Sequence, residues 1–264
     1  MSNVSISTNK LTIGYRRVAG DSYSHEAVIQ SNLSFSLYEG EMVCMLGPNG
    51  CGKSTLLRTL AGLQPALSGA FSIQCSAFRP EKSVALVLTE RLSMENTTVH
   101  DVVAMGRYPY TSFLGGLTDE DERIIEEALK SVGFELSTIN YQLSTVFNAH
   151  SDGEKQRILI AKALAQQTPV ILLDEPTAHL DLPHRILVLR LLRKLAHEQG
   201  KTVLISTHEL DLALALSDRI LLMKPTANSQ QPTAPNYWLD TTEHLKKADA
   251  FTSAFGMDIF NPLG

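Results

Sequence analysis

The stretch Gly47-Pro-Asn-Gly-Cys-Gly-Lys-Ser-Thr55 decides the fold of this chain. It matches the pattern G-x-x-x-x-G-K-[ST], whose glycines let successive backbone N–H groups turn inward and form a concave site for phosphate oxygens. Lys53 adds a full positive charge, and the Ser54 hydroxyl is placed to contact a magnesium ion. A glycine-rich turn without a ligand is the alternative, but the apolar run 42–46 before the stretch and the helical run 56–60 after it favour a phosphate-binding loop. The candidate nucleotide-binding residues of this loop are Gly47, Pro48, Asn49, Gly50, Cys51, Gly52, Lys53, Ser54 and Thr55.

The composition is that of a globular protein and carries no sign of a nucleic-acid-binding or membrane-spanning chain. The chain has 264 residues, of which 44% are hydrophobic and 19% charged, so we expect a globular protein with a sizeable core. A net charge of −5 without a block of Lys or Arg does not indicate a nucleic-acid partner. Cys44, Cys51 and Cys75 lack metal-ligand spacing and are odd in number, which favours a reduced, cytosolic location. There is no signal-peptide pattern and no long apolar run, so we expect that the chain does not span a membrane by itself.

Short apolar runs alternate with helical patterns along the chain. The strand-like runs lie at 42–46, 84–88, 170–173, 202–206 and 219–223. Such alternation predicts a mostly parallel sheet with helices on its faces. Residues 92–166 read mostly as helix, which interrupts the alternation and predicts a subdomain.

The two ends of the chain carry weaker signals. Residues 1–40 alternate weakly, as half-buried strands do, with a polar connection from Arg16 to Glu26. Residues 225–235 are rich in Pro, Thr, Asn and Gln, and we expect an exposed loop there. A polar helix is expected from about 242 to 250.

Three helix starts are marked by local signals. Thr118 and Asp121 form a capping-box pattern, and a second helix is expected to begin near Ser151. Leu182-Pro183 opens a long helix that Gly200 stops.

Two acids end the apolar run 170–173, and they fit the second half of a nucleotide site. An acid at the end of a buried strand, here Asp174, can hold magnesium, and the next acid, Glu175, is placed to act on a water that attacks the γ-phosphate. His208 follows another strand and could contact the same phosphate. The alternatives are two acids facing solvent and a histidine that merely ends a strand.

The segment His150-Ser-Asp-Gly-Glu154 lies between these acids and the phosphate-binding loop. A serine and a glycine at a helix start can bind an anion through a hydroxyl, backbone N–H groups and the helix dipole. Taken alone, the segment could equally be an N-cap followed by a charged first turn.

In this order the motifs resemble those of the ATP-binding cassette (ABC) ATPases, over nearly the whole chain. The residues 47–55 match Walker A, and 170–175 match Walker B with its following glutamate. Residues 178–181, with Asp181, match the loop that crosses to the other subunit, and Tyr15 matches the aromatic residue on which adenine stacks. His208 matches the switch histidine, and Ser151, Gly153 and Glu154 match the L-S-G-G-Q/E signature.

The resemblance implies a fold, a reaction and partners. The fold is α/β, with a P-loop NTPase core of mostly parallel strands, an N-terminal antiparallel β subdomain and a helical subdomain insertion. One domain over 1–264 would comprise a core of about 1–90 and 167–225, a helical subdomain of about 91–166 and a C-terminal extension of 226–264. Two cassettes would bind ATP and Mg²⁺ head to tail, with Ser151, Asp152, Gly153 and Glu154 of one chain closing over the nucleotide of the other. Glu175, His208 and Lys53 would serve catalysis, and Ser54 and Asp174 would hold the metal.

Within this family the chain resembles importers of iron chelates, haem and vitamin B12. The residues that carry this resemblance are 104–110 and 117–121. It implies a homodimer on the cytoplasmic face of the membrane, peripheral and bound to integral membrane permease subunits, with a periplasmic or surface substrate-binding protein acting indirectly. Packing of the helical subdomain is the alternative role for these residues.

Two positions depart from the family pattern. No glutamine follows the strand at 84–88, and Thr89 or Glu90 takes its place, so we hypothesise that one of them supplies an oxygen toward the metal. In the signature, His150 replaces a leucine and Asp152 replaces a glycine. A carboxylate near a γ-phosphate repels it, so we predict that Asp152 points toward its own chain or the permease side.

The sequence leaves two other function classes open. One is a soluble cassette ATPase that clamps a macromolecule in assembly or repair, although such proteins usually carry two cassettes, a coiled coil or a long linker. The other is a regulatory nucleotide-binding module with little turnover, against which the intact Lys53, Asp174, Glu175 and His208 speak.

Overall fold

The computed structural model describes residues 3–19, 23–74, 82–88, 94, 96–111, 116–134, 145–225 and 236–260. In this part of the chain a six-stranded sheet forms the centre of the molecule, in the order β10-β9-β4-β8-β7-β6. Its strands are β4 (Met42–Leu46), β6 (Val84–Val87), β7 (Val170–Asp174), β8 (Thr202–Ser206), β9 (Arg219–Met223) and β10 (Tyr237–Asp240). All neighbours pair in parallel except β10, which runs antiparallel to β9. The predicted α/β class with a mostly parallel sheet is confirmed.

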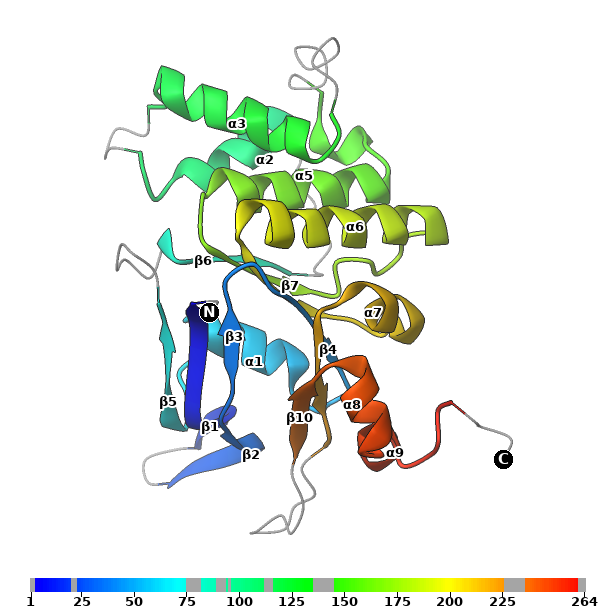
Figure 1. Cartoon of the computed structure of the whole chain (residues 1–264). Helices are drawn as coiled ribbons and strands as arrows, with labels where there is room; N and C mark the ends of the chain where they lie inside the picture. The colour runs from blue at the N-terminus through cyan, green and yellow to red at the C-terminus, as the bar shows by residue number, and fades with distance from the viewer. Residues whose placement is uncertain are drawn as a thin grey trace.

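These parallel strands are apolar throughout because both faces of the sheet are covered. All five residues of β4, β7 and β8 are buried. On one face lies α6 (Leu182–Gln199), and on the other lies α1 (Lys53–Leu60), between this sheet and the N-terminal sheet (Figure 1). Two separate hydrophobic clusters result, one on each face.

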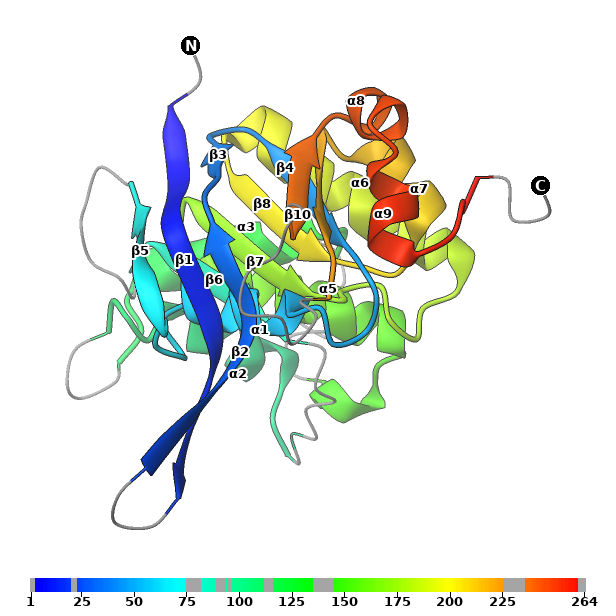
Figure 2. The same cartoon turned by 90° about the horizontal axis from the view of Figure 1, so that it is seen from below.

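The N-terminal strands form a second, antiparallel sheet in the order β2-β1-β3, with β5 paired to β1. Its strands are β1 (Val4–Ala19), β2 (Tyr23–Leu33), β3 (Ser36–Tyr38) and β5 (Ser68–Ile73). The expected polar connection from Arg16 to Glu26 is wrong, because β1 runs on to Ala19 and β2 already begins at Tyr23, and the paired strands project from the body (Figure 2). Arg16 Nε lies 3.1 Å from Glu26 Oε1 across the two strands. Arg16 and Glu26 are both exposed, so polar residues suit this part of the two strands and the alternation that marks a half-buried strand is not found there.

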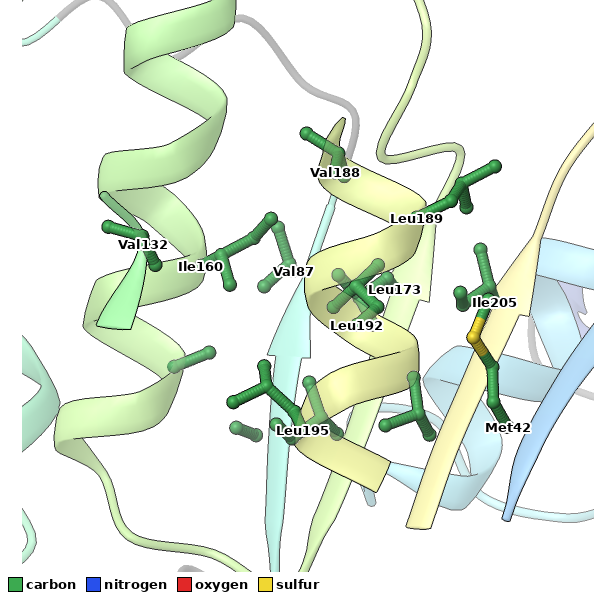
Figure 3. Packing of buried hydrophobic residues seen from close by; sticks show 14 of the residues in the cluster. Met42, Val87, Val132, Ile160, Leu173, Val188, Leu189, Leu192, Leu195 and Ile205 are labelled. Atoms are coloured by element: carbon green, nitrogen blue, oxygen red, sulfur yellow. The ribbon is translucent and has the colours of Figure 1, made fainter. Parts of the chain in front are cut away.

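The helical subdomain consists of α2 (Val99–Ala104), α3 (Asp119–Ser131) and α5 (Asp152–Ala165), with the short 3₁₀ turns η3 (Met105–Arg107) and η4 (Phe147–Ala149). Thr118 caps α3 through both hydrogen bonds of the predicted capping box. Figure 3 shows Ile160 of α5 pointing toward Val87 of β6, and both residues belong to the cluster that α6 also joins. The subdomain thus shares one apolar core with the central sheet.

The buried side chain of Arg107 fastens this subdomain together. Its Nε donates to Oδ1 of Asp121 at 2.7 Å, and Nη1 donates to the carbonyl oxygen of Ala165 at 2.8 Å. The hydrogen bonds from Thr118 and the contact with Arg107 lower the pKa of Asp121 to about 2. The Tyr110 ring lies 4.0 Å from the Arg107 guanidinium and 3.8 Å from the Lys82 ammonium, just before β6. Residues of the 104–110 motif therefore pack the subdomain against the core.

The C-terminal residues differ from the polar helix expected at 242–250. Strand β10 adds to the core sheet, and two short helices follow, α8 (Thr242–Lys247) and α9 (Ala250–Phe255). Asp249 between them has a φ of 49°, which no continuous helix allows. Leu245, Phe251 and Ala254 are buried, and Figure 1 places α8 and α9 near α7 (Leu210–Leu216) and β10. Residues 236–255 therefore belong to the folded body, because β10 pairs with β9 at the edge of the sheet and the two helices bury apolar side chains.

Among the described helices, none combines the length and the apolar character that crossing a membrane requires.

Candidate nucleotide-binding and hydrolysis site

The phosphate-binding loop leaves β4 at Leu46 and enters α1 at Lys53, as the sequence predicts. Lys53 is buried, and its Nζ donates to the carbonyl oxygens of Gly47 at 2.8 Å and of Pro48 at 3.3 Å. Gly47 has a φ of 153°, and a Cβ there would collide with the carbonyl oxygen of Met223 at the end of β9. Gly52 has a φ of 100°, in the left-handed region that favours glycine. The loop thus wraps around the ammonium group of Lys53 at the N-terminus of a helix, which is the geometry for an anion.

Gln30 supports the loop from below and was not found from the sequence. It is fully buried on β2, and its Nε2 donates to the carbonyl oxygens of Cys51 at 2.9 Å and of Lys224 at 2.5 Å. The side chain therefore ties the loop to the chain just after β9. A polar residue in a strand of the N-terminal sheet is the only sequence signal that points to it. The Cys51 thiol is also buried, and burial raises its pKa, so it acts as a small packing group.

Asp174, at the end of β7, hydrogen-bonds side chains of two other elements, α1 and β8. Its Oδ1 accepts hydrogen bonds from Ser54 Oγ at 3.1 Å and from Ser206 Oγ at 2.6 Å. Ser206 ends the neighbouring strand β8, and its Oγ also accepts from the backbone N–H of Glu175 at 2.9 Å. The structure thus brings together Ser54 and Asp174, which lie 120 residues apart in the chain. Ser206 was missed as a member of the site, although it is a polar residue that ends an otherwise apolar run.

These oxygens fit a magnesium ion. Mg²⁺ prefers hard oxygen ligands and is usually bound through one or two carboxylates together with substrate phosphates and water. The Ser54 hydroxyl and the Asp174 carboxylate offer such a donor set beside the phosphate-binding loop.

Glu175 and His208 form the next layer of the site. Nε2 of His208 lies 2.6 Å from Oε1 of Glu175, and both side chains are partly exposed, at 45% and 33%. Glu175 has a φ of 47°, a conformation that costs energy for a residue with a side chain and recurs at functional sites. Two hydrogen bonds from its backbone N–H to Ser206 hold it there, at 2.9 Å to Oγ and 3.1 Å to the carbonyl oxygen. The carboxylate is therefore oriented at the open edge of the sheet, where a water molecule can reach it.

Tyr15 stands beside the start of α1. Its hydroxyl lies 3.2 Å from Thr55 Oγ1, and the side chain is 45% exposed. A hollow of about 440 Å³ opens next to it, and its lining residues are Gly14, Tyr15, Arg16, Arg58, Leu63, Gln64, Pro65, Leu67 and Leu88. The hollow lies beside the loop and not over Lys53, so the expected adenine contact rests on the exposed Tyr15 ring.

The segment 150–154 begins α5. Ser151 is the N-cap, and its Oγ and backbone N–H donate to Oε2 of Glu154 at 2.8 and 3.0 Å. These hydrogen bonds, the backbone one first, lower the pKa of Glu154. His150 Nε2 lies 2.8 Å from Thr145 Oγ1, and Asp152 is exposed in the first turn. Ser151 and Glu154 therefore form the N-cap that the sequence left as an alternative, and the orientation of Asp152 relative to a partner remains a prediction.

Asp181 begins α6 as its N-cap and accepts from the backbone N–H of His184 at 3.2 Å. It lies near the segment 150–154, because a Cβ placed on Gly153 would come within 3.1 Å of the His184 ring. Thr89 and Glu90, the candidates for the missing glutamine, lie outside the described residues.

Comparison with known proteins places the chain in a family. Residues 30–178 match the ABC transporter family model. The iron(3+)-hydroxamate import ATP-binding protein of Bacillus subtilis is 37% identical over 236 residues, covering 87% of this chain and 82% of the relative.

Two solved structures extend the likeness to the fold. One, described as a metal-chelate type ABC transporter in an inward-facing conformation, has a TM-score of 0.78 at 28% identity and covers 96% of this chain and 90% of its own. A dimeric bacterial ABC transporter cassette has a TM-score of 0.67 at 27% identity, covering 82% of this chain and 93% of its own. With its phosphate-binding loop, its strand-end acids and these matches, the chain belongs to the ABC transporter family and is an ATP-binding ATPase of that family.

Proposed function

We propose that this protein is the ATP-hydrolysing subunit of an importer for a metal chelate, namely an iron chelate, haem or cobalamin. The single observation that carries the ATPase chemistry is the meeting of Lys53, Ser54, Asp174, Glu175 and His208 at the carboxyl edge of β4, β7 and β8. Ligands of open α/β sheets bind at this edge.

Each of these side chains has a role in the proposed reaction. Lys53 and the N–H groups at the start of α1 hold the phosphates of ATP. Ser54 and Asp174 hold Mg²⁺, which when bound neutralises charge on the β- and γ-phosphates. Glu175 orients the attacking water and takes its proton, and His208 keeps the carboxylate in place through the 2.6 Å contact.

A second copy of the chain completes the site in this proposal. Glu175 and His208 are 33% and 45% exposed, so one face of the site is open to solvent. A water-excluded site strengthens the electrostatic interactions that phosphoryl transfer depends on. The start of α5 with Ser151 offers a capped helix N-terminus that suits a phosphate of the facing chain. The likeness to a dimeric cassette supports this arrangement.

The import role and the substrate class rest on relatives. The B. subtilis relative is an iron(3+)-hydroxamate import protein, and the structural neighbour is of the metal-chelate type. A permease that spans the membrane is the required partner, with this chain bound peripherally at the cytoplasmic side and a substrate-binding protein acting only through the permease.

Affinity capture of this chain from detergent-solubilised native membranes, followed by mass spectrometry, tests the proposal. We expect a membrane protein with several spans to be recovered with it, and a Glu175→Gln form to enrich the complex when ATP is present. ATPase activity of the captured complex should rise when ferric hydroxamate, haem or cobalamin is supplied with its binding protein. Recovery of soluble or nucleic-acid-bound partners alone would contradict the importer role and favour a soluble cassette ATPase.

A further inference from the structure

Gly153 at the start of α5 faces the side chain of His184 at the start of α6. Gly153 is buried in the first turn of α5. The imidazole of His184 lies in the direction in which a side chain at position 153 would point. A Cβ on Gly153 would lie 3.1 Å from Cδ2 and 3.4 Å from Cγ of that ring. A methyl group at position 153 would therefore lie tighter against the ring than an ordinary van der Waals contact, and the ring would have to shift by a few tenths of an ångström to admit it.

The imidazole is fixed by the residue that caps α6. Oδ1 of Asp181 accepts the backbone N–H of His184 and also contacts the ring Nδ1. The contact with His184 is the main cause that lowers the pKa of Asp181. Because an ionised carboxylate only accepts hydrogen bonds, Nδ1 must donate, and the opposite edge of the ring, with Cδ2 and Nε2, faces Gly153. One side chain thus joins Asp181 to the segment 150–154.

The start of α6 is itself held from the other side. Arg185 Nε donates to the carbonyl oxygen of Leu180 at 2.7 Å, and its Nη1 lies 2.5 Å from Glu209 Oε1, just before α7. Pro183 fixes the backbone in the first turn. His184 therefore presents its ring to Gly153 from an anchored element.

We propose that His184 is a positioning residue for ATP hydrolysis, which sets the start of α5 against the loop that ends at Asp181. Because the ring joins the two segments, Ser151 and Asp181 move together toward the facing chain. Both segments therefore close over the nucleotide of that chain at the same time. The inference rests on the proposed head-to-tail dimer and adds to it the residue that aligns its two contact segments. The same contact, which lies within one chain, also accounts for the glycine at position 153.

A suppressor experiment tests this contact. Gly153→Ala forces a methyl group against the ring, and we expect it to lower ATP turnover by about tenfold. His184→Ala opens the space, and we expect a loss of about threefold because the segment is less well fixed. In the double variant the methyl group fits, so turnover should return to about the rate of His184→Ala alone. ATP affinity of the monomer should stay unchanged in all three, because the phosphate-binding loop is untouched.

His184→Asn separates the two contacts of the ring, because its amide still donates to Asp181 but does not reach Gly153. It should rescue Gly153→Ala as His184→Ala does. His244→Ala is the matched control, since Nδ1 of His244 in α8 lies 3.0 Å from Oδ1 of Asp240 at the end of β10 and the ring is not among the near neighbours of any described glycine. This variant should rescue nothing.

The outcomes also separate the inference from the proposed dimer. If the double variant stays as slow as Gly153→Ala, the glycine is required by the partner's nucleotide and the role of His184 is overturned while the dimer stands. ATP-dependent dimer formation, measured by light scattering in the Glu175→Gln background, should follow the same order as turnover. If the Glu175→Gln protein does not dimerise with ATP, in solution or with its permease, the proposed dimer fails and the inference fails with it.

Discussion

Nε2 of His208 lies 2.6 Å from Oε1 of Glu175, just beyond the ends of the neighbouring strands β8 and β7. The contact joins two segments that the chain order separates by α6. It gives the Glu175 carboxylate one defined orientation at an otherwise open edge of the sheet. The effect of this contact on ATP hydrolysis can be measured with variants of the two residues.

Glu175→Gln should abolish most hydrolysis while ATP still binds. The amide keeps the shape of the side chain but cannot accept a proton from water, so we expect phosphate release to fall by about 100-fold or more. Binding of a fluorescent ATP analogue should be unchanged because Lys53 and its loop remain. Glu243→Gln, an exposed glutamate in α8, is the control and should behave as wild type. A fully active Glu175→Gln protein would rule out this carboxylate as the base.

The effects of Glu175 and His208 should not add. Since the two side chains touch, His208→Ala should slow hydrolysis strongly in the wild-type background and change little when Glu175→Gln is already present. Single-turnover rates of the four proteins give the coupling directly. Independent, multiplying effects would mean that His208 acts on ATP without Glu175.

Asp174→Asn should raise the Mg²⁺ concentration that hydrolysis requires. Removal of Mg²⁺ with a chelator should stop the wild-type reaction, and the variant should need about tenfold more Mg²⁺ for half its maximal rate, because a neutral amide is a poorer ligand than a carboxylate. Titration of the rate with Mg²⁺ measures this shift. Asp211→Asn, an exposed change in α7, is the control and should leave the titration unaltered.

Gln30→Leu should destabilise the fold and loosen the phosphate-binding loop together. The variant leaves the carbonyl oxygens of Cys51 and Lys224 without the Gln30 amide, at a cost of about 1–3 kcal/mol in the free energy of unfolding. Urea unfolding measures the first effect, and the affinity for ATP measures the second. Gln199→Leu at the exposed end of α6 should show neither. Unchanged ATP affinity in a destabilised Gln30→Leu protein would mean that the loop holds its shape unaided.

Asp121 should make stability depend on pH in the acid range. Its pKa is lowered from 3.8 to about 2 in the folded protein. The stabilisation is therefore fully present above about pH 4, and it is lost as the pH falls toward 2 and the carboxylate becomes protonated. The shift corresponds to about 2 kcal/mol.

Asp121→Asn should be less stable than wild type near pH 6, since Arg107 stays buried without its carboxylate partner. The gap between the urea midpoints of the two proteins should narrow as the pH falls from 6 to 3, because the folded-state pKa of Asp121 is about 2. Asp119→Asn, an exposed change in the same first turn, should follow the wild-type curve. A gap that stays constant with pH would show that Asp121 does not titrate in this way.

Local patterns in the sequence determined the elements that carry the chemistry. A G-x-x-x-x-G-K-S stretch between an apolar run and a helix, the acids Asp174 and Glu175 after a second run, and the caps at Thr118 and Ser151 each lie within a few residues of one another. Capping, strand burial and loop curvature depend on neighbours along the chain, so these predictions do not require the fold. The α/β class followed from the same alternation of short runs and helices.

Only the tertiary structure decided which distant side chains meet. Gln30 hydrogen-bonds both the phosphate-binding loop and Lys224, which is 194 residues further along the chain. These contacts exist because β2 packs against the loop. The ring of His184 fills the space beside Gly153 because α5 and α6 begin side by side. The hairpin through Arg16 and Glu26 lacked a local signal for the same reason, since its polar residues pair across strands that protrude from the core. Sequence patterns report what a residue's neighbours along the chain require, whereas these contacts depend on strand order and packing, which only the folded chain specifies.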